Sequence, residues 1–436
     1  MRKTYLVLIL LGGLGFAVGC SSGGTTPAGI PSGGSTSANV LAIAVDGGPT
    51  ANQTGGFIYQ NGVFATATIC HPGSSSNCVK VDHLLVDTGS VGLRILQSEV
   101  SSLGLPTVNA SNGSAAYDCT SFVDGSYVWG PVESANVTLA GENTGNIPIQ
   151  VISSSPANIP TSCSNGGVND NTQSSLGANG ILGVGLEPFD CGEACDPSTA
   201  ESSIPPSGAY YTCSNSGCTP AFASCGAECN DSSSVQQVTH PVVMFPLDNN
   251  GVIVELPSVS GSAATVTGSL VFGIGTETNN QLTSTTNVFT VACDFFNTSF
   301  EGQAFNIDPN SCTGPGSFID SGSNGLFFYD VNNVLPPCPA SPTAAAAFYC
   351  PSSLMSLSAT VQDPNNSSIT EVVNFSINNA QTLLSSTNAA FSTLGGPVLA
   401  GQGFDWGLPF FYGRNVYVAI DGQTVPTPAP SPWWAF

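Results

Sequence analysis

The chain has 436 residues, which is too long for one hydrophobic core to grow comfortably, so we expect two domains or one unit with two lobes. Its 28 acidic and 5 basic residues give a formal charge of −23, which argues against a nucleic-acid partner because phosphates require a basic patch. Charged residues are only 8% of the chain and glycine is abundant, a composition that favours β-structure with many turns over helices.

The N-terminal segment has the pattern of a secretory signal. Arg2 and Lys3 precede an apolar run to about Val18, which is too short to cross a bilayer. Cys20 directly follows Ala-Val-Gly, an arrangement that resembles a bacterial lipobox. We therefore predict a signal peptide over residues 1–19 and lipidation of Cys20, with a plain secretory signal as the alternative. Residues 20–38 are predicted to form a flexible tether.

This segment predicts where the protein works. A lipid on Cys20 would hold the folded body on a membrane of the bacterial cell envelope, facing the periplasm or the exterior. The membrane is then a partner through the lipid anchor alone.

The cysteine count supports export. Fifteen cysteines less the lipid anchor leave an even fourteen, which favours disulfides in an oxidising compartment. Six lie between residues 191 and 229, and we interpret residues 187–235 as a disulfide-rich surface insertion, with a zinc site as the alternative. Three further pairs are close in sequence: Cys70 with Cys78, Cys293 with Cys312, and Cys338 with Cys350.

Strand-like runs separated by turn signals recur along the body, among them VLAIAV, GVFATATI, GVIVELP and NVYVAID. Helical periodicity is limited to short segments such as 378–384 and part of 91–103. The predicted fold class is therefore all-β. The chain has three histidines, no HExxH and no GxSxG motif, so no metal and no cofactor is predicted, and carboxylates are the side chains left for acid-base chemistry.

An internal repeat is the strongest signal. Residues 85–95 read LVDTGSVGLRI and residues 318–328 read FIDSGSNGLFF, with matched flanks. In each copy a buried apolar strand is predicted to end on an aspartate, Asp87 or Asp320, where the second following residue is a glycine that permits a sharp turn. Counting back from each aspartate gives a first lobe over 39–270 and a second over 271–436.

The residues around each aspartate are expected to support it. The threonine and serine hydroxyls directly after the aspartates can hydrogen-bond across the junction between the halves, and the serines three residues after the aspartates can bond the outer carboxylate oxygens. The six supporting residues are Thr88, Gly89, Ser90, Ser321, Gly322 and Ser323. Two carboxyls that face each other share one proton, so one can activate a water while the other protonates a carbonyl oxygen. The predicted chemistry is amide hydrolysis.

These motifs resemble those of the bilobal pepsin-like aspartic peptidases. The likeness extends to residues 179–183 (NGILG) and to residues 404–421 (FDWGLPFFYGRNVYVAID). The residues around the motifs, HxLVDTGSxGLRI and DWGLPFFYGR, also resemble those of a bacterial family of unknown function, DUF3443. This second resemblance runs from about residue 39 to the end and is closer than the resemblance to the peptidases. The resemblance implies a bilobal pepsin-like double β-barrel, here with a disulfide-rich insertion in the first lobe.

The chain departs from the peptidase pattern at the flap. Pepsin-like enzymes have a flap tyrosine and a tryptophan seven residues after the first catalytic aspartate, where this chain has arginine. Phe122 lies near the tyrosine position, and Tyr127 or Trp129 could cover the cleft instead. The arginine could pair with Asp124, lower the pKa of Asp87, or lie solvated on a polar face. The residues assigned to the flap and cleft are Phe122, Asp124, Gly125, Tyr127, Trp129 and Arg94.

Two functions follow. The first is an extracytoplasmic aspartic-type endopeptidase that uses Asp87, Asp320 and a water on a polypeptide substrate. The second is a catalytically silent lipoprotein that uses the same fold as a binding or scaffold module. A monomer is expected in either case.

Overall fold

The computed structural model describes residues 38–50, 58–110, 112–156, 158–196, 208–214, 217–224, 235–284, 286–339, 345–426 and 429–436. The predicted signal peptide, Cys20 and the tether up to residue 37 lie outside this part of the chain. Within it, none of the helices has the length and apolar character needed to span a membrane.

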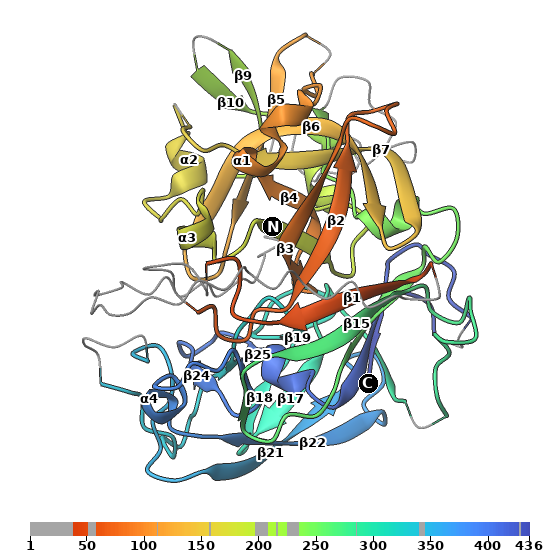
Figure 1. Cartoon of the computed structure of the whole chain (residues 1–436). Coiled ribbons are helices and arrows are strands. Elements are labelled where there is room, and N and C mark those ends of the chain that lie inside the picture. Colours follow the sequence, from red (N-terminus) through yellow and green to blue (C-terminus); the bar gives the residue numbers. More distant parts are fainter. Residues whose placement is uncertain are drawn as a thin grey trace.

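The fold is all-β, as predicted, with two lobes on either side of a shared sheet (Figure 1). The α-helices of the described residues have four residues each: α1 (Gln97–Val100), α2 (Thr161–Ser164), α3 (Gln173–Leu176) and α4 (Ala380–Leu383). The segment 91–103 is helical only from residue 97, because its first six residues form a buried strand.

Six strands of the first lobe close into a barrel, since each pairs with the next and the last pairs with the first. In order around the barrel they are β2 (Phe64–Cys70), β3 (Cys78–Asp87), β8 (Gly180–Val184), β4 (Val91–Leu96), β7 (Glu142–Ile152) and β6 (Tyr127–Leu139). Beyond β6 the sheet continues through β5 (Ala115–Ser121), β9 (Tyr210–Ser214) and β10 (Gly217–Pro220). The last two strands belong to the predicted insertion, which therefore extends the first lobe.

The shared sheet joins the lobes with strands from both ends of the body. Its order is β1 (Val40–Val45), β15 (Val266–Phe272), β13 (Gly251–Leu256), β26 (Arg414–Ala419), β27 (Trp433–Ala435) and β16 (Val288–Thr290). The predicted lobe boundary after residue 270 falls inside β15. Short two-stranded pairs lie outside the large sheets: β11 (Ala223–Ser224) with β12 (Val235–Gln236), and β14 (Ser262–Ala263) with β23 (Ala390–Phe391).

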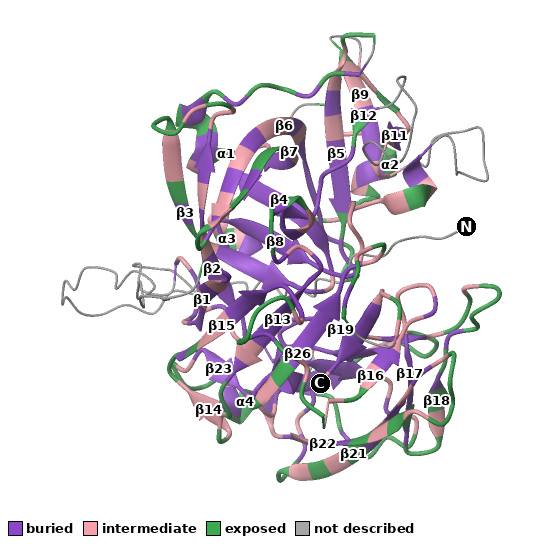
Figure 2. Ribbon diagram, turned by 90° about the vertical axis from the view of Figure 1, so that its right-hand side faces the viewer, coloured by how far each residue is buried: buried purple, intermediate pink, exposed green. Residues whose placement is uncertain are grey.

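The second lobe consists of two four-stranded sheets. One contains β18 (Gln303–Phe305), β17 (Asn297–Phe300), β21 (Met355–Gln362) and β22 (Thr370–Ile377). The other contains β19 (Ser317–Ile319), β25 (Phe404–Trp406), β20 (Leu326–Phe328) and β24 (Gly395–Pro397). Aromatic rings pack between them, with the Phe300 and Phe328 centroids 5.0 Å apart and those of Phe375 and Trp406 5.7 Å apart. The buried strands therefore lie inside and β21 and β22 face solvent on one side (Figure 2).

Disulfides close several of the hairpins and loops. The bonded pairs among the described residues are Cys70–Cys78, Cys119–Cys163, Cys191–Cys195, Cys213–Cys218, Cys293–Cys312 and Cys338–Cys350. Four of the six insertion cysteines are thus in disulfides, so the zinc alternative is wrong for these four; Cys225 and Cys229 lie outside the described residues.

Candidate active site

The two repeated loops meet at the junction of the lobes. Strand β3 ends on Asp87 and lies parallel to β8, while β19 leads into Asp320 and lies parallel to β25. Both aspartates are fully buried, at 0% exposure. Gly89 lies so close to the opposite loop that a Cβ there would be 2.7 Å from Cγ of Asp320, which only glycine avoids. The two carboxyls therefore face each other.

Four crossed hydrogen bonds lock the loops together. The backbone N–H of Thr88 donates to Oγ of Ser321 (3.1 Å), and the N–H of Ser321 donates to Oγ1 of Thr88 (2.9 Å). The threonine hydroxyl in turn donates to the carbonyl of Ile319 (2.9 Å), and the serine hydroxyl donates to that of Val86 (2.7 Å). The predicted hydroxyl bonds across the junction are present, and they form a pseudo-symmetric pair.

Each carboxyl is also bonded within its own loop, but unequally. Oδ1 of Asp87 accepts from the N–H of Gly89 (2.9 Å). The carboxyl of Asp320 accepts from the N–H of Gly322 (2.7 Å) and from the hydroxyl of Ser323 (2.8 Å). Ser323 thus has the predicted contact, whereas Ser90 lies close to Asp87 without a well-formed hydrogen bond to it.

The environment separates the proton affinities of the pair. Burial raises the pKa of Asp87, while the neighbouring donors of Asp320, Ser90 and Gly89 and the positive charge of Arg94 lower it in part. Burial raises the pKa of Asp320 well above its ordinary value, and the charges of Asp87 and Asp405 raise it further. Asp320 therefore holds the shared proton and can donate it to Oδ2 of Asp87, which receives no other donor among the described residues.

A third buried carboxyl, Asp405, lies behind the pair. It is 2% exposed, and neither of its oxygens has a hydrogen-bond partner in the described part of the chain. Residue 405 is opposite Phe318 in the parallel β19–β25 pair, two residues before Asp320, so both carboxyls point to the same side of the sheet. Burial raises its pKa well above the ordinary value, and the charge of Asp87 adds to this rise, so Asp405 binds its proton more tightly than an exposed aspartate does.

Sequence reasoning missed Asp405, although an internal alignment could have found it. In the first lobe Leu85 is opposite Ile181, and Phe318 and Asp405 occupy the equivalent positions in the second lobe. Asp405 therefore stands where the first lobe has the buried residue Ile181, and this substitution of an acid for an apolar residue could have pointed to the site.

Arg94 is buried in an ion-pair cluster. It is 1% exposed, and its Nη2 lies 2.8 Å from Oδ2 of Asp190 and 3.5 Å from Oδ2 of Asp118. Its Nε donates to Oγ1 of Thr120 (2.8 Å), and Tyr210 donates its hydroxyl to Oδ1 of Asp190 (2.6 Å). Burial and the charge of Asp190 raise the pKa of Asp118 to about 8, despite the arginine. The cluster ties the insertion to β4 and β5.

Two of the three expectations for Arg94 are wrong. The side chain is not solvated, because the insertion residues Asp190 and Tyr210 lie over it, and it pairs with Asp118 and Asp190 instead of Asp124. The remaining expectation agrees with the structure, since the arginine charge lowers the pKa of Asp87.

The flap hairpin between β5 and β6 is present. The N–H of Phe122 donates to the carbonyl of Ser126 (2.9 Å), and Gly125 has a φ of 86°, which suits the Asp124-Gly125 turn. Phe122 is buried in a cluster that also contains Tyr59.

Tyr127 and Trp129 occupy the other face of the hairpin. They pack with Cys119, Cys163 and Tyr211, in a cluster separate from that of Phe122. The expectation that either ring covers the carboxyl pair is therefore wrong, because alternate residues of a strand point to opposite faces.

A different tyrosine, Tyr59, lies next to the pair. Burial raises the pKa of its phenol well above the ordinary value, and the charges of Asp320 and Asp87 are the next largest causes. A Cβ at Gly62 would lie 2.4 Å from Cδ1 of this ring, and one at Gly177 would lie 2.1 Å from Cδ2, so two glycines make room for its two edges. No sequence motif includes Tyr59, so its position beside the aspartates could not be predicted without these contacts.

No group of three or more histidine, cysteine, aspartate or glutamate side chains in the described ranges is arranged to hold a metal ion. The site is therefore a cluster of carboxyl, hydroxyl and phenol groups.

Comparisons with known proteins place the chain among its relatives. The model of a family described as "Protein of unknown function (DUF3443)" matches residues 35–436. No curated protein matches the chain. Among solved structures, the chain is similar to an aspartic proteinase from Irpex lacteus, with 14% sequence identity and a TM-score of 0.44, over 87% of this chain and 94% of that one.

Proposed function

We propose that the chain, which belongs to the DUF3443 family of proteins of unknown function, is an aspartic-type endopeptidase that uses Asp87, Asp320 and a water. The observation that carries this proposal is the meeting of two buried carboxyls on loops locked by crossed hydrogen bonds. In the same proposal the body works outside the cytoplasm, held to the bacterial cell envelope by a lipid on Cys20, and its substrate is a polypeptide.

The difference in proton affinity assigns the roles. Asp87, whose pKa Arg94 lowers, is the base that takes a proton from the attacking water. Asp320, whose pKa Asp405 raises, is the acid that protonates the carbonyl oxygen of the scissile amide. When the tetrahedral intermediate collapses, Asp87 passes its proton to the leaving nitrogen and Asp320 recovers one from the hydroxyl. Both carboxyls then return to their starting states.

Substrate access requires a movement of the chain. The pair is fully buried, and Tyr59 and Phe122 belong to one buried cluster on the first-lobe side. We expect the loop that carries Tyr59 and the flap turn at Asp124 to separate when a polypeptide enters.

The test is cleavage of an unfolded protein by the purified, intact protein from acidic to neutral pH. Asp87→Asn and Asp320→Asn should each lower the cleavage rate by about 10³-fold or more, because each removes one proton-transfer group. Glu301→Gln, which changes an exposed acid of the second lobe, is the matched control and should cleave like the wild type. Equal inertness of the wild type and both variants would contradict the proposal.

Full burial of the pair also supports a second candidate, the silent binding or scaffold module. In that case the aspartate loops serve only as the junction between the lobes. Asp87→Asn and Asp320→Asn would then change thermal stability without any cleavage to lose, and the intact protein would retain a specific envelope partner in pull-down experiments. Proteolysis that requires both aspartates would exclude this candidate.

A further inference from the structure

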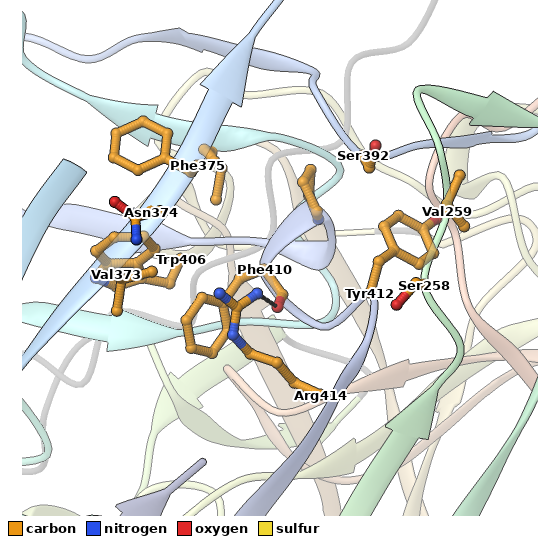
Figure 3. Close-up of a pocket in the computed structure, with 12 residues that line it drawn as sticks. Ser258, Val259, Val373, Asn374, Phe375, Ser392, Trp406, Phe410, Tyr412 and Arg414 are labelled. Carbon is orange, nitrogen blue, oxygen red and sulfur yellow. Dashed lines mark hydrogen bonds between the residues drawn. The ribbon is translucent and has the colours of Figure 1, made fainter. Parts of the chain in front are cut away.

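A pocket of about 260 Å³ opens in the second lobe, lined by β20, β22, β25, β26 and the loop after β13 (Figure 3). Its lining residues include Trp406, Phe410 and Phe375 on one side and Tyr412 and Val259 on the other. Trp406 and Phe410 are buried, at 0% and 3% exposure, so polar atoms form the larger part of the surface that faces the pocket. Small-molecule sites use a few placed polar groups to orient their ligand.

Arg414 supplies the only cation of this lining. Its guanidinium lies 4.5 Å from the centroid of the Phe410 ring, and its Nη1 donates to the carbonyl of the same residue (2.6 Å). The guanidinium lies against the Phe410 ring at the edge of the pocket (Figure 3). Arg414 makes no ion pair in the described part of the chain, whereas Arg94 has two carboxylate partners.

This arrangement is unusual for so acidic a protein. The chain has 28 acidic residues, yet no carboxylate approaches Arg414 within ion-pair distance among the described residues. Glu371 acts on it only at longer range, and burial lowers the pKa of the guanidinium. A half-buried guanidinium with free donors is well placed to bind a carboxylate, since its fork matches two carboxylate oxygens.

The pocket is separate from the aspartate pair. Trp406 lines the pocket, while its neighbour Asp405 acts electrostatically on Asp320 and Asp87. Successive side chains of a strand point to opposite faces, so β25 separates the two sites.

The geometry points to a binding site for a small carboxylic acid, held by Arg414. The volume is slightly below the ~300–1,000 Å³ of pockets for drug-sized ligands, so the ligand is no larger than a single-ring acid. A neutral analogue would leave the guanidinium without an anion.

The probe is 3-phenylpropanoate, titrated into the intact protein by isothermal calorimetry, with 3-phenylpropanamide as the neutral control ligand. We expect the acid to bind and the amide to bind at least tenfold more weakly. Arg414→Gln should weaken binding of the acid by about tenfold or more, because it removes a charge-assisted, bidentate contact. Arg414→Lys should fall between the two.

Lys80→Gln is the matched control variant, since it removes an exposed cation of the first lobe and should leave binding unchanged. If Arg414→Gln does not fold, Asn374→Trp keeps the arginine and places a ring at an exposed strand position beside the pocket, and it should abolish binding. Absence of binding to the wild type, equal binding of acid and amide, or unchanged affinity in folded Arg414→Gln would each overturn the inference.

Discussion

The two copies of the repeat each pair an ionisable side chain with an apolar one, but on opposite strands and of opposite kind. In the first lobe Arg94 is opposite Ile181, whereas in the second lobe Phe327 is opposite Asp405. Each of these four residues is buried, and each pair adjoins the loop that carries its aspartate. A nearly symmetric backbone thus holds a cation beside one carboxyl and a third carboxyl beside the other.

A symmetric pair of loops thus becomes chemically asymmetric. The crossed hydrogen bonds between the loops treat the two aspartates alike. Residues on the strands beside the loops separate the pKa values of the two aspartates, because Arg94 lowers the pKa of Asp87 and Asp405 raises that of Asp320. Exchanging these residues between the lobes is therefore the direct way to examine the asymmetry.

The largest effect is expected from Arg94→Phe, which gives the first lobe the residue of the second. It leaves Asp118 and Asp190 buried without their cation, which should cost about 3–5 kcal/mol of unfolding free energy. Urea denaturation at pH 7 measures it. Adding Asp118→Asn and Asp190→Asn should recover most of the lost stability. If Arg94→Phe alone is as stable as the wild type, Arg94 is not needed to balance the charges of the two aspartates.

The junction should show the next largest effect. Thr88→Val leaves the backbone N–H of Ser321 buried without its acceptor, and Ser321→Ala does the same to Thr88, so each should cost about 1–3 kcal/mol. The double variant should lose less than the sum of the two, because the four bonds hold one junction and either change already loosens the loops that the other pair of bonds joins. Denaturation of all four proteins at one pH gives the coupling energy. Strict additivity would mean that the crossed bonds do not act as one unit.

Asp405→Asn should change the pH dependence of stability. The folded protein keeps a proton on Asp405 that the unfolded chain releases above its ordinary pKa of 3.8, so the wild type loses stability as the pH rises above that value. One extra bound proton gives a slope of about 1.4 kcal/mol per pH unit at most. The variant, which mimics the neutral acid, should show a flatter decline. Identical slopes would place Asp405 in the ionised state.

The smallest effect is expected at His83, outside the repeat. Burial alone would lower its pKa, but Asp46 and Asp82 raise it to about 9. The ion pairs thus stabilise the fold fully below the unfolded pKa of about 6.5, and this contribution is lost as the pH rises through about 9. His83→Gln should cost about 1 kcal/mol at pH 6, because solvent screens these partners, and nothing well above pH 9. A cost independent of pH would indicate packing alone.

The sequence predicts much of this site because its signals are local. Each copy of the repeat around Asp87 and Asp320 is one contiguous segment, so the strand and the glycine turn can be predicted from adjacent residues. Hairpin cysteines such as Cys70 and Cys78 are equally short in range.

The rest depends on contacts between distant segments. Tyr59 is positioned by Gly177, and Arg94 is neutralised by Asp190 from the insertion, so no spacing reveals either contact. The bond between Cys119 and Cys163 likewise joins strand β5 to helix α2, which are 44 residues apart at these cysteines. Predicting these contacts requires the packed structure, because side-chain burial and charge pairing are settled only when the segments meet.

The order of strands in the shared sheet affects how the chain folds. Among the described residues, β16 joins this sheet only through β27, although residues 288–290 precede residues 433–435 by most of the second lobe. Loop closure over such a separation is slow, and contacts of high sequence separation form late. The pairing of β16 with β27 in the shared sheet should therefore form after each lobe has collapsed. Refolding experiments should show a late kinetic phase in which the fluorescence of Trp433 and Trp434 changes.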